Sequence, residues 1–223
     1  MTSKQLNIRA SSVAKLMTDP QSKADRESGL LSKTAMGHLC DLAVQHVYGV
    51  EFVLDNKYLR KGIACEQDSI DLYNTVFGTS LVKNSERRTR DGLTGEPDLI
   101  LINDEIRNGV DIKTAWSLQT FPAFVHQIDG KGYEWQARAY MALFDCDTWT
   151  IAYCLVDTPG DLITWIDDAE LPLHKGFDER YWPEQRITCL TYTRDVEKES
   201  LMFSRIHRGL EELDKLVKEL EKK

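Results

Sequence analysis

The chain has 223 residues, of which 42% are hydrophobic and 29% are charged, and its formal net charge at pH 7 is −8. This composition is typical of an ordinary soluble protein, and the length allows a substantial core without disulfides. The negative charge argues against a surface that coats nucleic acid, although a local basic groove can still steer DNA. The five cysteines form no CxxC pair, and no signal peptide or bilayer-spanning run is visible, so we expect a cytoplasmic protein with reduced thiols and no membrane partner.

The first third of the chain is expected to be mainly helical. The run IRASSVAKLM predicts a short strand end followed by a helix, and the polar run DPQSKADRESGL predicts a loop. Apolar residues at helical spacing then predict one helix over residues 32–47 and another over 56–77, which stops at Gly78.

The pattern changes to strands at about residue 80. We expect strands over 80–90, 93–102, 107–114, 148–156 and 187–192, and helices over 117–126, 133–144 and from about 195 onward. The last helix has an apolar stripe that packs on the body of the domain or, alternatively, on a second subunit: Ile206, Leu210, Leu213, Val217 and Leu220. No repeat or linker divides the chain, so we expect a single α/β (α+β) domain over residues 1–223.

The stretch GEPDLILINDEIRNGVDIK indicates the clearest chemistry. Asp98 and Asp111 lie on neighbouring predicted strands, so their carboxylates can meet at one end of a hairpin. Such oxygens suit Mg²⁺ or Mn²⁺, and Lys113 follows on the same strand face, where it can orient or deprotonate an attacking water. A solvated surface hairpin is the alternative, but residues 99–102 are all apolar and do not alternate. The pattern favours a metal-dependent phosphodiesterase.

Two predicted helices add polar residues to this set. Glu66 follows the small residues Ala64 and Cys65, and Gln136 and Tyr140 lie one turn apart on one helical face. The alternative is a surface glutamate and the polar fringe of an amphipathic helix. In a functional role, Gln136 and Tyr140 would hold a phosphate or the strand beside the metal.

In the order KGIACE, GEPDL, VDIKT and YEWQARAY, these segments resemble the PD-(D/E)xK nuclease superfamily. More narrowly they resemble its lambda exonuclease-like branch, also called the YqaJ-type viral recombinase or phage alkaline exonuclease family. The runs IRASSVAKLM and TWTIAYCLVDTPG and the last helix are similar to that family too, so the resemblance covers most of the chain. It implies a restriction-endonuclease-like core, in which helices flank a central mixed β-sheet, and a long C-terminal helix.

The resemblance also implies roles for the charged residues. Glu66, Asp98 and Asp111 would hold two Mg²⁺ or Mn²⁺ ions, with Asp98 bridging them. Lys113 would be the catalytic lysine. The absence of clustered cysteines argues against the related iron–sulfur nucleases.

The resemblance also implies roles for polar residues near Asp98, Asp111 and Lys113. Gln136 and Tyr140 match a QxxxY pattern beside the site, and Gln136 is counted with the catalytic residues. Ser11 would help to hold the 5′-phosphate end of DNA. The arginine that the family places shortly before this serine has no clear match, and Arg9 is the nearby candidate.

Basic residues near these motifs have two interpretations. Arg87, Arg88 and Arg90 could grip DNA phosphates, or could simply be solvated beside Glu86 and Asp91. The same alternatives hold for the basic residues on the helix that leads to Glu66, which are Lys57, Arg60 and Lys61.

Together these features predict a Mg²⁺-dependent 5′→3′ exonuclease that digests linear double-stranded DNA in phage-type recombination. By resemblance it would form a ring-shaped homo-oligomer, a trimer, and would have a single-strand annealing protein as partner in the cytoplasm of a bacterial host. One alternative is an endonuclease of the same fold. The other is an inactive DNA-binding or assembly module, against which the intact set of Asp98, Asp111 and Lys113 argues.

Overall fold

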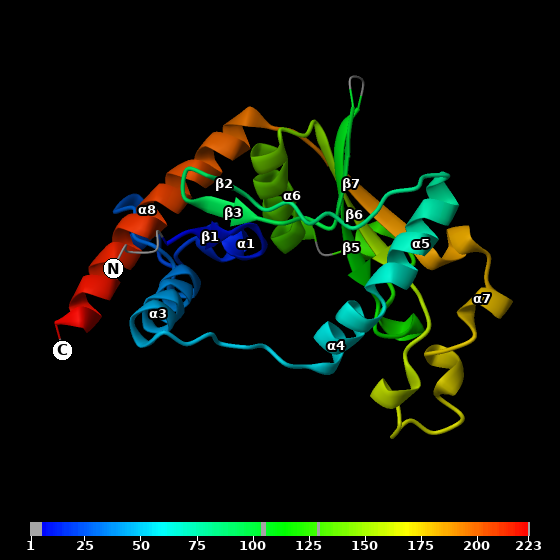
Figure 1. Ribbon diagram of the computed structural model, residues 1–223. Helices are drawn as coiled ribbons and strands as arrows, with labels where there is room; N and C mark the ends of the chain where they lie inside the picture. Colours follow the sequence, from blue (N-terminus) through cyan, green and yellow to red (C-terminus); the bar gives the residue numbers. More distant parts are fainter. Residues whose placement is uncertain (1–5, 104–105, 129, 223) are drawn as a thin grey trace.

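A four-stranded mixed sheet forms the centre of this computed structural model, which describes residues 6–103, 106–128 and 130–222 (Figure 1). The strands lie in the order β4 (Leu99–Ile102), β5 (Arg107–Thr114), β6 (Thr148–Cys154) and β7 (Ile187–Thr193). The β5–β6 pair is parallel and the other pairs are antiparallel. A parallel pair needs a crossover connection, and this connection contains α6 (Gly130–Phe144).

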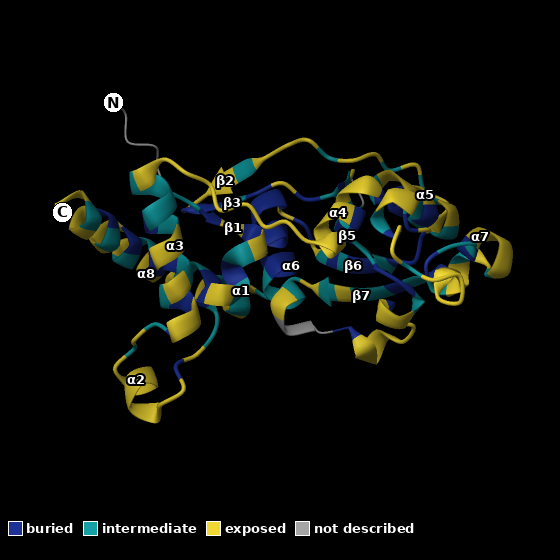
Figure 2. Ribbon diagram, turned by 90° about the horizontal axis from the view of Figure 1, so that it is seen from below, coloured by how far each residue is buried: buried dark blue, intermediate teal, exposed yellow. Residues whose placement is uncertain are grey.

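Helices cover both faces of this sheet. Val110 and Ile112 of β5 pack on one face with Ile70 and Leu72 of α5 (Glu66–Phe77). Because side chains alternate along a strand, Asp111 and Lys113 point to the other face, where α6 lies. Figure 2 shows α6 and β6 largely buried, whereas α2 (Lys23–Glu27) and α7 (Phe177–Arg180) are mostly exposed.

A small second sheet lies beside α6. Its strands are ordered β1 (Ile8–Arg9), β3 (Leu93–Gly95) and β2 (Arg88–Arg90). The turn between β2 and β3 has positive φ angles at Asp91 (49°) and Gly92 (79°), as tight hairpins require. The chain leaves β3 at Gly95 and enters β4 at Leu99, so residues 96–98 connect the two sheets.

Of the remaining helices, α1 (Val13–Leu16), α3 (Lys33–Tyr48) and α8 (Val196–Glu221) pack on one another, and α4 (Lys57–Ala64) contacts α5 and β5. Ser32 caps α3 through Ala35 N (3.0 Å), and Asp195 caps α8 through Lys198 N (3.0 Å). Short 3₁₀ turns cover Ala10–Ser12, Leu118–Thr120, Val125–Gln127, Gly160–Leu162, Leu171–Leu173 and Pro183–Arg186.

The long C-terminal helix packs on the body of the protein. Ile206, Leu213 and Val217 are buried in the main core, and α8 lies against α3. The prediction of a mixed sheet flanked by helices, with a long last helix, is confirmed. The organisation as a single domain stays a prediction. In the part of the chain that the structure describes, no helix is both long and apolar enough to span a membrane.

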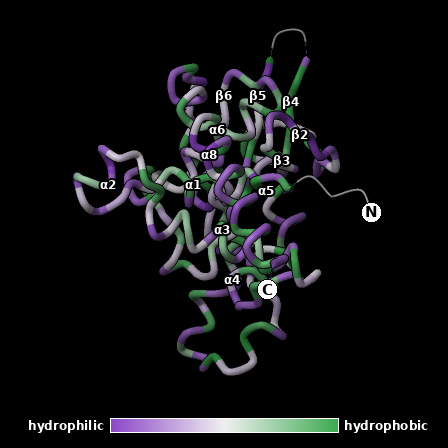
Figure 3. Tube along the Cα trace, turned by 90° about the vertical axis from the view of Figure 1, so that its left-hand side faces the viewer, coloured by the Kyte–Doolittle hydropathy of each residue, from purple (hydrophilic) through white to green (hydrophobic). Residues whose placement is uncertain are grey.

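Several predicted elements were wrong in detail. The helix over 56–77 is two helices, because the chain turns at Cys65 between α4 and α5. The strand over 93–102 is split between β3 and β4, which belong to different sheets; β4 is the hydrophobic run labelled in Figure 3. Of the strand over 80–90 only β2 forms, and the predicted helix over 117–126 is two 3₁₀ turns.

Candidate active site

Asp98 and Asp111 lie just beyond the last paired residues of β4 and β5. Leu99 pairs with Val110, so in the same register Asp98 falls opposite Asp111, with both side chains on the α6 face. The backbone N–H of Ile112 donates a 2.7 Å hydrogen bond to Oδ2 of Asp98. Asp98 is therefore fixed at the end of β4 by the strand that carries its partner.

Asp111 is contacted through both of its carboxylate oxygens. Its side chain is buried, with the residue only 2% exposed. Gln136 Nε2 in α6 donates a 3.2 Å hydrogen bond to Oδ1, and the ammonium of Lys113 forms an ion pair with Oδ2. Lys113 Nζ also lies 5.2 Å from the centre of the Tyr133 ring. Asp111, Lys113 and Gln136 thus form one connected group on one face of the sheet.

The charges of this group perturb one another. Burial and the neighbouring charge of Asp111 raise the pKa of Asp98 to about 7, against the opposing hydrogen bond from Ile112 and the charge of Lys113. Burial alone would lower the pKa of Lys113, but the carboxylates of Asp111 and Asp98 outweigh it and raise that pKa. Lys113 therefore does not offset the carboxylates of Asp98 and Asp111 together, and the site favours a further positive charge.

Glu66 lines the same cavity from the N-terminal end of α5. It is the first residue of α5, and its carboxylate forms an ion pair with Lys83, whose side chain is 53% exposed. Within the described ranges, no three Cys, His, Asp or Glu side chains lie close enough together to hold a metal ion. Glu66, Asp98 and Asp111, the three predicted metal ligands, therefore line one cavity, but they are not close enough together to coordinate one ion.

That cavity has a volume of about 510 Å³ and is open to solvent. It collects six of the residues that the sequence singled out, which are Glu66, Asp98, Asp111, Lys113, Gln136 and Tyr140. Tyr58, Leu59 and Ile63 of α4 form an apolar wall, together with Trp116.

Tyr140 supports the segment that carries Asp98. Its hydroxyl donates to the carbonyl of Glu96 (3.4 Å), and its ring stacks on Trp149 with the centroids 5.0 Å apart. Burial raises the pKa of Tyr140 to about 12, so the hydroxyl stays protonated and remains a donor. A Cβ at Gly95 would lie 2.7 Å from this ring, which leaves no space there for a side chain.

Of the predicted DNA contacts, Tyr140 lines this cavity, whereas Ser11, Arg9, Arg87 and Arg88 are not among its lining residues. Ser11 is exposed in the turn Ala10–Ser12. Arg9 and Arg87 line a second cavity of about 650 Å³, between the small sheet and α3. Arg87 Nη2 also lies 3.0 Å from Glu96 Oε2. Glu96 is two residues before Asp98, so this ion pair connects Arg87 to the segment that carries Asp98.

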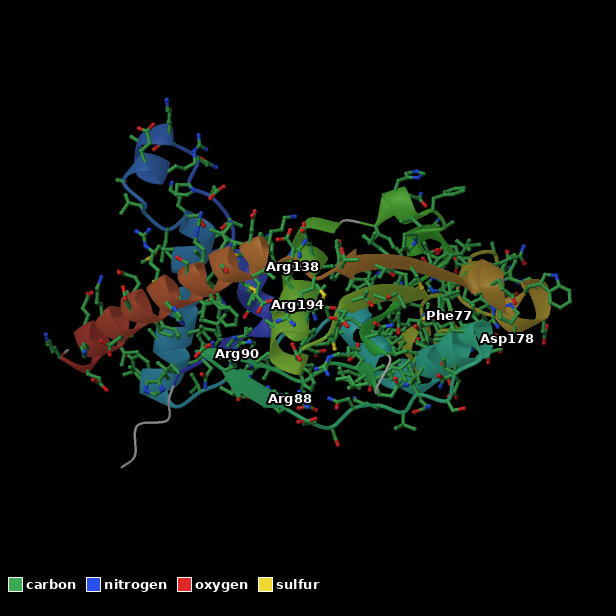
Figure 4. All side chains as sticks on the ribbon, turned by 90° about the horizontal axis from the view of Figure 1, so that it is seen from above. Phe77, Arg88, Arg90, Arg138, Asp178 and Arg194 are labelled. Carbon is green, nitrogen blue, oxygen red and sulfur yellow. The ribbon has the colours of Figure 1, made fainter. Side chains whose placement is uncertain are left out.

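The other two arginines of this run are engaged by the body of the protein. Arg88 forms an ion pair with Glu86 (2.7 Å) and stacks its guanidinium 4.4 Å from the Phe144 ring centre. Arg90 donates to the carbonyl of Ala142 (3.2 Å). Figure 4 shows both beside α6 and α8, in the region of Arg138 and Arg194, and far from Phe77 and Asp178.

Two lysines have positions that the sequence did not indicate. Lys83 contacts Glu66 from a stretch without helix or strand, so no periodicity marks it. For Lys61 the sequence allows a phosphate contact or a solvated side chain, and both interpretations are wrong because the residue is 0% exposed. The pattern of α4 is misleading, since its apolar residues Leu59 and Ile63 are exposed while Lys61 is buried.

The fold is similar to those of solved exonuclease structures. No protein-family model and no curated protein matches the sequence. Among solved structures, a phage-related exonuclease from Haemophilus somnus 129PT is 31% identical, with a TM-score of 0.86 over 97% of both chains. An alkaline exonuclease from Laribacter hongkongensis, LHK-Exo, is 16% identical, with a TM-score of 0.67 over 97% of this chain and 92% of its own. LHK-Exo in complex with dAMP is 17% identical, with a TM-score of 0.66 over the same shares of the two chains.

The α/β architecture and its long last helix are those of nuclease-like exonuclease folds. The chain belongs to the phage-related, lambda exonuclease-like exonuclease family. The resemblance found in the sequence is therefore confirmed at the level of fold and family.

Proposed function

We propose that the chain is a Mg²⁺-dependent deoxyribonuclease that digests linear double-stranded DNA from its 5′ ends. The observation that carries this proposal is the group of Asp98, Asp111 and Lys113, held in one open cavity with Gln136. Two carboxylates and a lysine on adjacent strands suit the hydrolysis of a phosphodiester. Membership of an exonuclease family supports the same class of reaction.

The residues present fit a divalent metal. Asp98 and Asp111 would supply hard oxygen ligands, and the raised pKa of Asp98, caused by burial and by the charge of Asp111, supports a site that takes up added positive charge. They would hold Mg²⁺ or Mn²⁺, and Glu66, which lines the same cavity, would help to hold a second ion. When bound, the metal would polarise the phosphate and lower the pKa of a nearby water.

The remaining residues would act on the substrate and on one another. Lys113 would orient the attacking water and offset charge on the phosphate as it builds up. Gln136 would hold Asp111 in its orientation through the 3.2 Å hydrogen bond. Tyr140 would support the Asp98 segment through the carbonyl of Glu96.

The DNA would approach from the side of the small sheet. Arg9 and Arg87 line one cavity there, and their charge suits the backbone of an incoming strand. Ser11 would contact the 5′-phosphate, and Arg88 would contribute only if it left Glu86. LHK-Exo has been solved with dAMP, and we propose a mononucleotide product for this chain as well.

We further propose a ring-shaped homo-oligomer, a trimer, that encloses the duplex, and a single-strand annealing protein as its partner. Phage-type recombination in the cytoplasm of a bacterial host is the corresponding setting. Family membership supports these assignments.

The test uses three DNA substrates with Mg²⁺ or with chelator: linear duplex with 5′-phosphate, linear duplex with 5′-hydroxyl, and covalently closed circular duplex. We expect Mg²⁺-dependent release of mononucleotides from linear DNA, fastest with 5′-phosphate, and an intact circle. Cleavage of the circle would instead indicate the endonuclease. Binding without cleavage in any metal would indicate the inactive module.

A further inference from the structure

Lys61 is a fully buried cation outside the proposed catalytic group. It lies in α4 and is 0% exposed. Its ammonium donates hydrogen bonds to the carbonyl of Trp116 (3.1 Å) and to the carbonyl of Val156 (2.8 Å). These acceptors are 55 and 95 residues away in sequence, so the contact connects distant parts of the chain.

The two carbonyls lie just beyond the two parallel strands of the central sheet. Trp116 comes two residues after the end of β5, and Val156 comes two residues after the end of β6. Strand β5 carries Asp111 and Lys113. One ammonium therefore joins α4 to the end of the strand that carries the catalytic group and to its neighbour.

Helix α4 also contacts the segment after β5 on its N-terminal side, where the Tyr58 and Trp116 rings pack edge to face with their centroids 5.9 Å apart and Lys57 Nζ lies 4.9 Å from the Trp116 ring centre. Residues 49–56, which connect α4 to α3, form no helix or strand and are exposed (Figure 1). On its C-terminal side, the helix turns at Cys65, whose thiol lies 3.4 Å from the carbonyl of Asp157, and α5 begins at once with Glu66. The position of Glu66 therefore depends on how α4 is held against the sheet.

We propose that Lys61 is a positioning residue, which fastens α4 to the ends of β5 and β6 and thereby holds Glu66 at the cavity that contains Asp98 and Asp111. This inference rests on the proposed nuclease function for its effect on rate. Its structural part, the fastening of α4, is independent of that function.

A lysine suits this task better than an apolar residue. An apolar side chain would fill the space without the cost of burying an amine, but it would leave the Val156 carbonyl without this donor. Trp116 also accepts from the hydroxyl of Thr158 (3.2 Å), so its carbonyl is part of a wider network. Losing Lys61 would loosen α4 without removing any group that touches the substrate.

The rate test is a double-mutant cycle with Glu66. Lys61→Met keeps the length of the side chain and removes the donors, Glu66→Gln removes the carboxylate, and Lys215→Met removes an exposed lysine of α8 as a control. We expect Lys61→Met to lower kcat on linear duplex by about 10- to 100-fold with little change in KM, because a small displacement of a reacting group has effects of this size. In the Glu66→Gln background, Lys61→Met should cost about 2-fold or less. Independent, multiplicative losses would overturn the proposal.

Hydrogen–deuterium exchange tests the fastening itself, whether or not the protein cleaves DNA. We expect Lys61→Met to speed amide exchange in residues 57–77 and to leave α8 unchanged, with Lys215→Met like wild type. If Lys61→Met does not fold, Lys61→Gln, which keeps an N–H donor, replaces it in both tests. Unchanged exchange in 57–77 in the variant that folds would overturn the proposal; an inactive wild type with the expected exchange would overturn only the nuclease function.

Discussion

Gln136 of α6 donates a 3.2 Å hydrogen bond to Oδ1 of Asp111, a carboxylate that is 2% exposed. Lys113 pairs with the other oxygen, so the orientation of this carboxylate is fixed from two directions. The helix in the β5–β6 crossover is thus hydrogen-bonded to β5, the strand that carries Asp111 and Lys113.

Replacing Gln136 by Met should leave Oδ1 of Asp111 without its donor. Because an unsatisfied buried acceptor costs about 1–3 kcal/mol, we expect a loss of stability of this size in urea denaturation. We also expect kcat to fall by about 10- to 100-fold. The control is Gln67→Met, which breaks a similar bond to Asp71 (2.8 Å) on the exposed surface of α5. Equal effects of the two substitutions would contradict the role of Gln136.

Asp98→Asn should stabilise the metal-free protein. The folded state raises the pKa of Asp98 to about 7, above its ordinary value of 3.8, so the charged form is disfavoured and the stability falls as the pH rises through this range. An asparagine keeps an oxygen for the N–H of Ile112 and removes the charge next to Asp111. With chelator at about pH 8, we expect the free energy of unfolding to rise by about 1–3 kcal/mol. A decrease would show that the two carboxylates do not repel each other.

Lys61 should make the stability depend on pH in an alkaline window. Burial lowers its pKa from 10.5 to about 8, against the opposing charges of Cys65 and Asp157, and Lys61 in turn acts on His174. Between these two values the folded protein binds fewer protons than the unfolded chain, so its stability rises with pH by up to about 1.4 kcal/mol per pH unit. The measurement is the difference in unfolding free energy between wild type and Lys61→Met from about pH 7 to 10. A difference that stays flat or falls over this window would contradict the buried amine.

Gly109→Ala should destabilise the protein. Gly109 lies in β5 two residues before Asp111, and a Cβ there would come within 2.1 Å of the Trp149 ring. We expect a loss of about 1–3 kcal/mol in thermal or urea unfolding, because the indole is buried and cannot move aside freely. Gly37→Ala in α3, where a Cβ would meet nothing within 4 Å, is the matched control and should stabilise by up to about 1 kcal/mol. A neutral Gly109→Ala would refute the close packing.

The elements with strong periodicity could be predicted from the sequence. Helices α3 and α8 and strands β5 and β6 form close to their expected bounds, because each pattern agrees with the burial of one face. The division of 93–102 could not be predicted, since Asn84 supplies hydrogen bonds to the carbonyls of Pro97 and Asp98 from outside the hairpin. The helix expected over 117–126 fails around Pro122, which lacks an N–H.

In the site, too, residues marked by a local sequence pattern could be predicted, whereas residues held by contacts distant in sequence could not. Asp98, Asp111 and Lys113 could be placed together from strand spacing. Glu66 and Gln136 could be singled out on predicted helices, and the family resemblance joined them to the same site; all five line one cavity. Lys83 and Lys61 could not be placed, because their partners come from other parts of the fold. The catalytic and metal-binding roles of the site residues stay predictions.

The most direct test of the central claim is Mg²⁺-dependent digestion of end-labelled linear duplex by Asp111→Asn. This substitution keeps the size of the side chain and removes the charge that Lys113 and a metal would share. We predict that a folded Asp111→Asn protein releases no mononucleotide above background. Asp214→Asn, which alters an exposed carboxylate paired with Lys218 on α8, should digest the duplex like wild type. Full digestion by folded Asp111→Asn would contradict the assignment of this cavity as the active site.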